Sequence, residues 1–395
     1  MKKKKVLYFV PENPLVGKAG NLTRFKKLLY YFIDNKADFD IDLLSVRYWD
    51  DNGNWQPADL ELFKQQLPEV NLHIFNRKPP KTRFFQYLFN YKLPLLWHTL
   101  FVKKKTLDVT TFYFREQMHK LLQTQKYDVI ILSYANWANL LNRTPDSPYL
   151  ILDTHDFLTL QQKFNTPDLG DVIFTSLQEE INELKKFDEV WSYSTEEQYI
   201  FDQFTENLNV KFFPASIPVA KCRRTETNKY DLLYVASDNG HNIKGINWYI
   251  EQVLPFLPDD VTTYMAGAIC TKIGDHPRIV KLGVVEDIDT IYQETKIVIC
   301  PMLTGTGIKI KVLEALSYGI PVVTNRRGVD GLLNKVQNGC LVMDKAEDFA
   351  QGILALLNDA NLYNKLAEQG KTYFELNHSP EKEKEFLDSV FYKVS

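Results

Sequence analysis

The chain has 395 residues, of which 45% are hydrophobic and 25% are charged, and this composition excludes an intrinsically disordered protein. A chain of this length has room for two domains of ordinary size. The formal net charge of −3 argues against a protein that binds nucleic acid through bulk charge, so nucleic acid is not an expected partner.

The cysteines and the apolar runs bear on where the protein works. Four cysteines are scattered along the chain without metal-ligand spacing, as expected for reduced thiols in a cytosolic protein: Cys222, Cys270, Cys300 and Cys340. No apolar run approaches the length of a transmembrane helix, and no signal-peptide pattern precedes the first strand. We therefore expect a cytoplasmic protein.

The chain opens with the pattern of a Rossmann-like domain. Residues 6–10 predict a buried strand, residues 22–35 have apolar positions at helical spacing, and residues 39–49 predict a second strand. Gly17 and Gly20 lie in the loop between the first strand and the helix, where glycine lets the backbone approach a ligand closely. The same pattern also fits an ordinary strand-to-helix turn.

Residues 77–105 combine basic and aromatic side chains without a single acidic residue. The basic residues are Arg77, Lys78, Lys81, Arg83, Lys92 and Lys103–Lys105, and the aromatic residues include Phe84, Phe85, Phe89 and Trp97. This composition is typical of a surface that binds anionic lipid. It also fits a pair of helices packed on the domain with lysines toward water, and nothing elsewhere in the chain supports stacking of nucleic-acid bases on these rings.

Residues 127–134 and 149–156 predict two further buried strands, and the second ends in Asp153, His155 and Asp156. Ligands of open α/β sheets bind at the carboxyl ends of the strands, so these three side chains are candidates for a ligand site. We expect Asp156 to orient the ring of His155 by a hydrogen bond. A single histidine at a strand end is also commonly structural.

A polar, charged stretch over residues 222–231 predicts a linker. We expect an amino-terminal domain over residues 1–218, a carboxy-terminal domain over residues 228–378, and a last helix over residues 379–395 that crosses back onto the first domain. Residues 231–237 predict the first strand of the second domain.

Residues 297–331 predict a strand, a glycine-bearing loop, a helix and a second strand. Gly305 and Gly307 allow a tight turn, and the first turn of the following helix offers unpaired N–H groups to an anion. Lys309 and Lys311 are expected to add two mobile positive charges. We expect Glu314 about two turns into the helix, where it can accept hydrogen bonds from ribose hydroxyls. An ordinary βαβ unit with solvated lysines is the alternative.

The combination of strand, Gly-Thr-Gly loop, two lysines, glutamate and Gly-x-Pro-Val-Val resembles the donor-binding signature of GT-B glycosyltransferases, particularly the retaining family 4 and its relatives. The resemblance implies that Gly305, Thr306 and Gly307 hold a nucleotide diphosphate with Lys309 and Lys311, and that Glu314 holds the ribose. Many family 4 members carry an earlier glutamate that contacts the donor sugar. Thr306 stands at that position here, so recognition of the donor sugar is expected to differ.

The same resemblance assigns roles elsewhere. Lys244, followed by Gly245, resembles the lysine that binds the donor diphosphate. Gly17 and Gly20 resemble the first glycine loop of the amino-terminal domain. His155 matches the histidine that approaches the donor sugar and phosphate, which makes it the expected catalytic residue together with Asp156.

The resemblance implies an α/β protein of GT-B fold, with two Rossmann-like doubly wound domains facing a central cleft. The expected reaction is retaining transfer of a hexose from a nucleoside diphosphate sugar to a glycan or lipid-linked acceptor in polysaccharide biosynthesis, without a cofactor or a metal ion. The protein would act in the cytoplasm as a peripheral protein on an anionic membrane surface. The alternatives are a sugar-nucleotide epimerase of the same fold, a non-catalytic nucleotide-sugar-binding protein and an anion-binding membrane adaptor.

Overall fold

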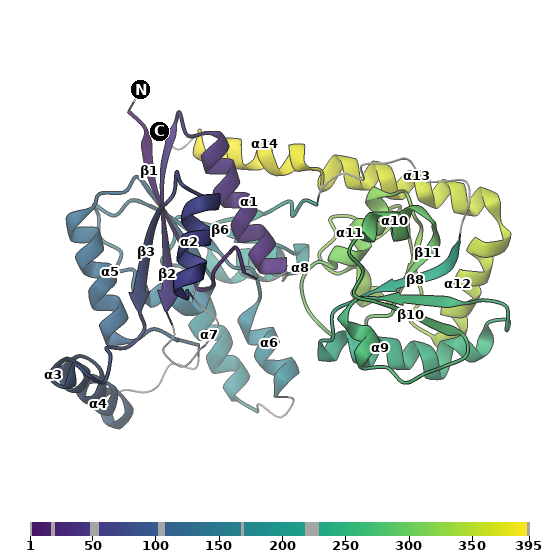
Figure 1. Cartoon of the computed structure of the whole chain (residues 1–395), viewed down its shortest axis with the longest axis horizontal. Coiled ribbons are helices and arrows are strands. Elements are labelled where there is room, and N and C mark those ends of the chain that lie inside the picture. Colours follow the sequence, from purple (N-terminus) through teal and green to yellow (C-terminus); the bar gives the residue numbers. More distant parts are fainter. Residues whose placement is uncertain are drawn as a thin grey trace. The chain divides into compact units, whose positions relative to one another are not determined.

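The computed structural model describes residues 2–16, 20–47, 55–101, 107–166, 170–217 and 229–392 (Figure 1). The chain divides into two compact units. The first contains residues 1–192 and 198–211, and the second contains residues 193–197 and 212–395. The expected domain limits at residues 218 and 228 both fall in the stretch between the last two described ranges and stay a prediction.

The first unit is built on a seven-stranded sheet with the order β3-β2-β1-β4-β5-β6-β7. Its strands are β1 Lys4–Val10, β2 Phe39–Arg47, β3 Asn71–Asn76, β4 Val129–Ser133, β5 Tyr149–Asp153, β6 Glu189–Ser192 and β7 Asn209–Phe212. Its helices are α1 Gly20–Asp34, α2 Pro57–Gln66, α3 Phe84–Tyr87, α4 Leu93–Phe101, α5 Phe112–Thr124, α6 Leu158–Asn165, α7 Val172–Leu184 and α8 Thr195–Thr205. A π-helical segment, Leu88–Lys92, joins α3 to α4, and a 3-10 helix, Ala135–Leu140, follows β4.

Strand β1 is an inner strand of this sheet and is buried on both faces. The apolar run of β1 from Val6 to Val10 is completely buried, as a strand covered on both faces requires. It pairs in parallel with β2 on one side and with β4 on the other, so that Val6 lies opposite both Ile41 and Val129. The order of the strands reverses between β1 and β4, and such a switch point is where open α/β sheets bind ligands.

The second unit repeats the design with a six-stranded sheet of order β10-β9-β8-β11-β12-β13. Its strands are β8 Tyr230–Val235, β9 Thr263–Ala266, β10 Ile279–Gly283, β11 Thr295–Cys300, β12 Val322–Thr324 and β13 Cys340–Val342. Its helices are α9 Gly240–Trp248, α10 Ile288–Gln293, α11 Ile310–Ser317, α12 Ala346–Asn358, α13 Ala360–Asn377 and α14 Pro380–Phe391. The π segment Tyr249–Val253 and the 3-10 helices Leu254–Phe256, Ala268–Thr271 and Arg326–Val329 complete it.

The switch point of this second sheet lies between β8 and β11, which pair in parallel. The loop after β8 leads into α9, and the loop after β11 leads into α11 (Figure 1). Two parallel sheets with helices around them confirm the predicted α/β class of two Rossmann-like domains.

Candidate functional site

The carboxyl edge of β8 and β11 brings together the residues that the sequence marked as donor-binding in the second unit. Lys244 comes from α9, the Gly-Thr-Gly loop follows β11, and Lys309, Lys311 and Glu314 lie at the start of α11 and along it. Nδ1 of His241, in the first turn of α9, lies 2.9 Å from the hydroxyl oxygen of Thr304, which places the start of α9 next to the glycine loop.

The loop glycines have the backbone conformation for which glycine is needed. Gly305 has a φ of 107° and Gly307 a φ of 68°, both in the left-handed region that side chains with a Cβ rarely adopt. A Cβ at Gly307 would meet no atom within 4 Å, so this glycine is required by its conformation and not by crowding.

Gly245 serves a different purpose, which is close packing. A Cβ at this position would lie 1.7 Å from the carbonyl oxygen of Pro301, at the beginning of the loop after β11. Helix α9 therefore crosses that loop at a distance that only glycine permits. Lys244, the residue before it, is exposed.

Lys309 is not the mobile charge that the sequence suggested. Only 7% of the residue is exposed, and its Nζ donates hydrogen bonds to the carbonyl oxygens of Thr306 at 3.2 Å and Gly307 at 2.6 Å. Burial lowers the pKa of Lys309, while the carboxylate of Asp330 opposes that shift. The ammonium group thus acts as a fixed clamp inside the glycine loop.

Lys311 is also held in place. Its Nζ donates to Oδ1 of Asn242 at 2.8 Å and lies 4.6 Å from the ring centroid of Tyr234. Burial lowers the pKa of Lys311 as well. The side chain therefore ties α11 to α9, and the expectation of two mobile lysines is wrong at both positions.

Glu314 lies nearer to the start of its helix than predicted. Because α11 begins at Ile310, Glu314 is its fifth residue and lies about one turn in, not two. Its Oε2 accepts a hydrogen bond of 2.8 Å from the hydroxyl of Tyr292, a ring that stacks on Tyr318. Burial raises the pKa of Glu314, and this hydrogen bond opposes the shift.

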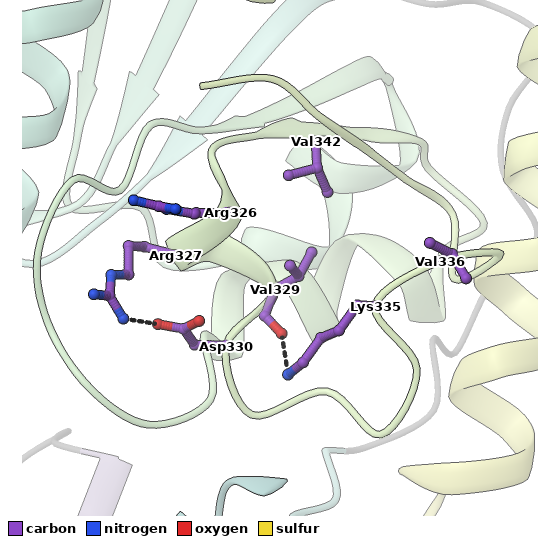
Figure 2. A pocket seen from close by; sticks show the side chains of 7 residues that line it. All are labelled: Arg326, Arg327, Val329, Asp330, Lys335, Val336 and Val342. Carbon is purple, nitrogen blue, oxygen red and sulfur yellow. Dashed lines mark hydrogen bonds and ion pairs between the residues drawn. The ribbon is translucent and has the colours of Figure 1, made fainter. Parts of the chain in front are cut away.

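A pocket of about 560 Å³ adjoins this site and is rich in positive charge (Figure 2). Its lining residues are Arg326, Arg327, Val329, Asp330, Lys335, Val336 and Val342. Asp330 connects the pocket to the glycine loop through its interaction with Lys309, and Arg327 donates to the Asp330 carboxylate at 3.2 Å. Gly331 packs against Ile308, since a Cβ there would lie 2.9 Å from the Ile308 backbone.

In the first unit, the amino-terminal candidates lie at the switch point between β1 and β4. Gly20 begins α1, whereas Gly17 lies outside the described residues. Asn21, in the first turn of α1, donates from Nδ2 to Oε2 of Glu12 at 3.2 Å and to the hydroxyl of Tyr134 at 3.1 Å. These contacts join the loops after β1 and β4.

His155 follows β5 at the same edge and is held by packing and by charge. Its φ is +57°, and only 1% of its side chain is exposed. The ring lies 4.7 Å from the ring of Tyr134 and 4.9 Å from that of Phe25, measured between centroids. Its Nε2 lies 2.9 Å from Oδ2 of Asp153 and 3.3 Å from Oγ of Ser133.

The carboxylate at His155 Nε2 is that of Asp153, and the expected hydrogen bond between Asp156 and the ring stays a prediction. The left-handed backbone at His155 turns the ring back toward the end of its own strand. Asp156 is half-buried, and burial raises its pKa. The charge of Arg24 is the largest effect that opposes this shift.

Glu180, which the sequence did not single out, fixes the segment that follows. It is completely buried and accepts hydrogen bonds from the backbone N–H of Leu158 at 2.9 Å and of Thr159 at 2.8 Å. The carboxylate therefore caps the start of α6 directly after His155 and Asp156.

Among the residues that the structure describes, no group of three or more His, Cys, Asp or Glu side chains could hold a metal ion. In the same residues no helix is long and apolar enough to cross a membrane.

Comparison with known proteins begins with the second unit. Residues 229–359 match the family described as "Glycosyl transferases group 1". An uncharacterized 44.6 kDa protein in the cps region of Klebsiella pneumoniae is 20% identical over 299 residues, which cover 68% of this chain and 75% of that protein.

Solved structures resemble the chain over nearly its whole length. Sucrose-phosphate synthase from Thermosynechococcus elongatus aligns with a TM-score of 0.70 at 12% identity, covering 99% of both chains. Anabaena HepE, solved in complex with UDP and glucose, aligns with a TM-score of 0.66 at 14% identity and covers 99% of this chain and 100% of its own. TarM of S. aureus, in a complex that contains UDP, aligns with a TM-score of 0.65 at 14% identity, with coverage of 98% and 99%.

The structural neighbours share the fold, and the family match falls on the unit that carries the Gly-Thr-Gly loop. The resemblance seen in the sequence is thereby confirmed: the chain has the fold of the GT-B glycosyltransferases, and residues 229–359 in its second unit match the group 1 glycosyl transferase family.

Proposed function

We propose that the protein transfers a hexose from a nucleoside diphosphate sugar to a hydroxyl of a glycan or lipid-linked acceptor, with retention of configuration. The observation that carries the proposal is the edge of β8 and β11, where fixed cations, a left-handed glycine loop and a glutamate meet at the start of one helix. Retention follows from the family 4 enzymes that the sequence resembles.

The cations have a specific task in this reaction. Negative charge builds up on the leaving diphosphate as the glycosidic bond breaks, and groups that are already in place stabilise it most effectively. The clamped Lys309, the exposed Lys244 and the N–H groups at the start of α11 would supply this stabilisation. Because these charges would do what a divalent cation does in other transferases, we propose that the reaction needs no metal ion, so that activity persists in EDTA.

The remaining residues would position the donor. Glu314 would hold the ribose, with Tyr292 fixing one carboxylate oxygen at 2.8 Å so that the group keeps one orientation. Thr306 would stand near the sugar without offering a carboxylate. His155, held by Asp153 at 2.9 Å, would approach the sugar and the phosphate from the first unit during domain closure.

Two relatives support the choice of substrates. HepE has been solved with UDP-glucose, and TarM with UDP and α-GlcNAc-glycerol, which favours a UDP-sugar donor and a hydroxyl acceptor. The Klebsiella pneumoniae relative is described as lying in a cps region, which favours a role in polysaccharide biosynthesis.

The first experiment is a thermal-shift panel of UDP- and GDP-sugars, because a ligand that binds the folded state stabilises it according to its occupancy. The sugar that gives the largest shift is then incubated with the protein alone and with acceptor extracts. Transfer to acceptor supports the proposal. An isomerised donor without acceptor would indicate an epimerase, and binding without transfer or hydrolysis would indicate a non-catalytic binder.

We also propose that the protein attaches to an anionic membrane surface through what we call the α3–α4 surface. Its large apolar residues are each between 43% and 74% exposed: Phe84, Phe85, Phe89, Leu93, Leu95, Leu96, Trp97 and Leu100. The two helices lie beyond one end of α5, away from the sheet (Figure 1). Contiguous apolar exposure of this kind marks an interaction site.

The basic side chains on this surface favour anionic lipid as its binding partner. Lys81, Arg83 and Lys92 are exposed beside the apolar residues, and residues 77–105 contain no acidic side chain. Basic side chains around inserted aromatic and aliphatic side chains match an anionic bilayer surface. Lys103–Lys105, which continue the basic run, lie outside the described residues.

Sedimentation with lipid vesicles tests this attachment independently of catalysis. The wild type should sediment with vesicles that contain phosphatidylglycerol and much less with pure phosphatidylcholine. The double variant Phe85→Ser, Trp97→Ser should lose sedimentation, whereas Phe174→Ser should keep it because Phe174 is similarly exposed but lies on α7. Replacing Lys103–Lys105 with Gln should weaken it.

Sedimentation of the double variant equal to wild type would contradict the membrane assignment. Absence of wild-type sedimentation, combined with a concentration-dependent dimer that the double variant abolishes, would assign the surface to a second copy of the chain.

A further inference from the structure

His241 lies directly against the glycine loop, although the sequence gave no reason to single it out. It is half-buried in the first turn of α9, and its Nδ1 lies 2.9 Å from the hydroxyl oxygen of Thr304. A Cβ on Gly305 would lie 3.5 Å from Cγ of the imidazole. The ring therefore covers the loop segment that precedes the anion seat.

Three contacts fix the start of α9, and with it the backbone of His241. Asn239 caps α9 by accepting a hydrogen bond of 2.9 Å from the N–H of Asn242. The side chain of Asn242 in turn accepts a hydrogen bond of 2.8 Å from Lys311 of α11. At Gly245, one turn later, the helix touches the carbonyl of Pro301. Helix α9 thus holds His241 against the loop, and a ligand-binding side chain needs such a fixed position.

The charges that face the ring are positive and come from both elements. The charge of Lys309, at the end of the glycine loop, acts on the ring, as does the charge of Lys244 in the next turn of α9. Burial lowers the pKa of His241 first, and these two cations lower it further. Both effects favour the uncharged imidazole in the ligand-free protein.

We propose that His241 is a donor-binding residue that contacts the diphosphate beside Lys309 and takes up one proton from solution when the nucleotide sugar binds. The inference rests on the proposed function, because it requires a diphosphate in this site. A diphosphate brings two negative charges to the two cations. This cancels the positive charge that the imidazole faces and favours the imidazolium form.

The hydrogen bond to Thr304 gives this protonation a structural consequence. A neutral Nδ1 can accept the hydroxyl proton of Thr304, whereas a protonated Nδ1 can only donate. The Thr304 oxygen then accepts from the ring, and its own O–H is released to donate to an oxygen of the ligand. One proton taken up by the ring thus adds a charge-assisted contact and frees a second donor.

Calorimetry of the full-length protein with UDP-glucose tests the inference. Binding heats measured at the same pH in buffers of different ionisation enthalpy give the number of protons taken up. A nucleotide sugar suits this measurement because its diphosphate is doubly esterified and has no group that titrates near pH 7. We expect a fraction of a proton to be taken up at pH 7, and affinity about tenfold higher at pH 6 than at pH 8.

His241→Gln should abolish the uptake and make affinity nearly independent of pH over this range. His276→Gln is the matched control, because His276 is half-buried in the same unit but lies in the turn before β10. Uptake that survives in His241→Gln would assign the proton to another group and overturn the inference. If that variant does not fold, the wild type still decides, since binding without uptake between pH 5.5 and 8.5 also overturns it.

The two proposals fail in different ways. If no UDP- or GDP-sugar produces binding heat or a thermal shift, the proposed function fails and the role of His241 fails with it. If a nucleotide sugar binds without a change in protonation, only the role of His241 fails.

Discussion

Lys309 is the residue on which the candidate donor site depends most directly. Its ammonium group is buried and bonded to two backbone carbonyls of the loop that it follows. The ammonium group shapes the loop through these two hydrogen bonds. Among the contacts that the structure describes, Lys309 makes no direct ion pair, so its charge can attract an anion.

Replacing Lys309 by Ala should weaken UDP binding by about 10- to 100-fold, which corresponds to losing a charge-assisted hydrogen bond of about 1.5–3 kcal/mol. Calorimetric titration with UDP measures the change. Lys365→Ala on α13 serves as the control, since that lysine is exposed. Equal affinities of the two variants would remove Lys309 from the diphosphate site.

A variant at His155 must tolerate the left-handed backbone conformation of this residue. Because its φ is +57°, asparagine is the best replacement, since asparagine tolerates the left-handed region. His155→Asn should lower kcat by at least about 100-fold, as the loss of one positioned donor in an active site does. Affinity for UDP, which binds in the second unit, should change little.

Full turnover by His155→Asn would show that the histidine is structural. Thermal unfolding of His155→Asn separates a loss of activity from a loss of stability. The comparison is with Asp153→Asn, which keeps the histidine but neutralises the carboxylate at its Nε2.

At the scale of elements, the packing of α9 on the loop after β11 determines whether the donor loop is formed. Gly245→Ala would place a methyl group 1.7 Å from the Pro301 carbonyl oxygen. We expect a loss of stability of about 1–3 kcal/mol, the usual cost of overpacking, together with weaker UDP binding.

Gly240→Ala is the matched control, because a Cβ at that position, at the start of the same helix, meets no atom within 4 Å. Denaturant unfolding of both variants measures the difference. A Gly245→Ala protein as stable as Gly240→Ala would mean that the helix does not pack on the loop this closely.

The elements that the sequence predicted well are those with strong apolar runs. The strands β1, β4, β5, β8 and β11 were readable because both faces of a central parallel strand are buried. Helices α2 and α5 and strand β3 were not predicted. Strand β3 lies at the sheet edge with only partly buried residues, and α2 buries only Phe63. Helix α5 buries Phe114, Met118 and Leu121 at helical spacing, and the sequence reading missed this pattern.

The candidate site, too, was predicted from the sequence only in part. Sequence spacing placed Gly305, Lys309 and Glu314 near one helix start, because they are close along the chain. It could not show that Lys309 points back into its own loop, nor that Asp153 reaches His155 Nε2, because a single left-handed residue decides the second point. His241 and Thr304 are 63 positions apart, so only the fold could bring them together.

At the scale of the whole molecule, a buried histidine links stability to pH. His378 is completely buried, with Nδ1 3.0 Å from the carbonyl oxygen of Ala215 and Nε2 3.2 Å from the hydroxyl of Tyr373. Burial lowers the pKa of His378 to about 4. These contacts join residues 212–217 to the end of α13 within the second unit.

Because the unfolded chain takes up the proton near pH 6.5 and the folded chain does so only near pH 4, the contribution of His378 to stability is complete above pH 6.5 and is lost as the pH falls to 4. The loss should reach about 3 kcal/mol, at 1.36 kcal/mol per pKa unit. Denaturant unfolding between pH 4 and 8 measures it. In His378→Gln this part of the pH dependence should disappear, and an unchanged profile would assign it to other groups.

The proposed function depends most of all on where the diphosphate lies. The most direct measurement is a crystal structure of the protein with bound UDP-glucose. We predict the diphosphate against the N–H groups at the start of α11, between Gly305 and Lys309, with the ribose at Glu314. A nucleotide bound elsewhere, with this helix start covered by protein, would contradict the account.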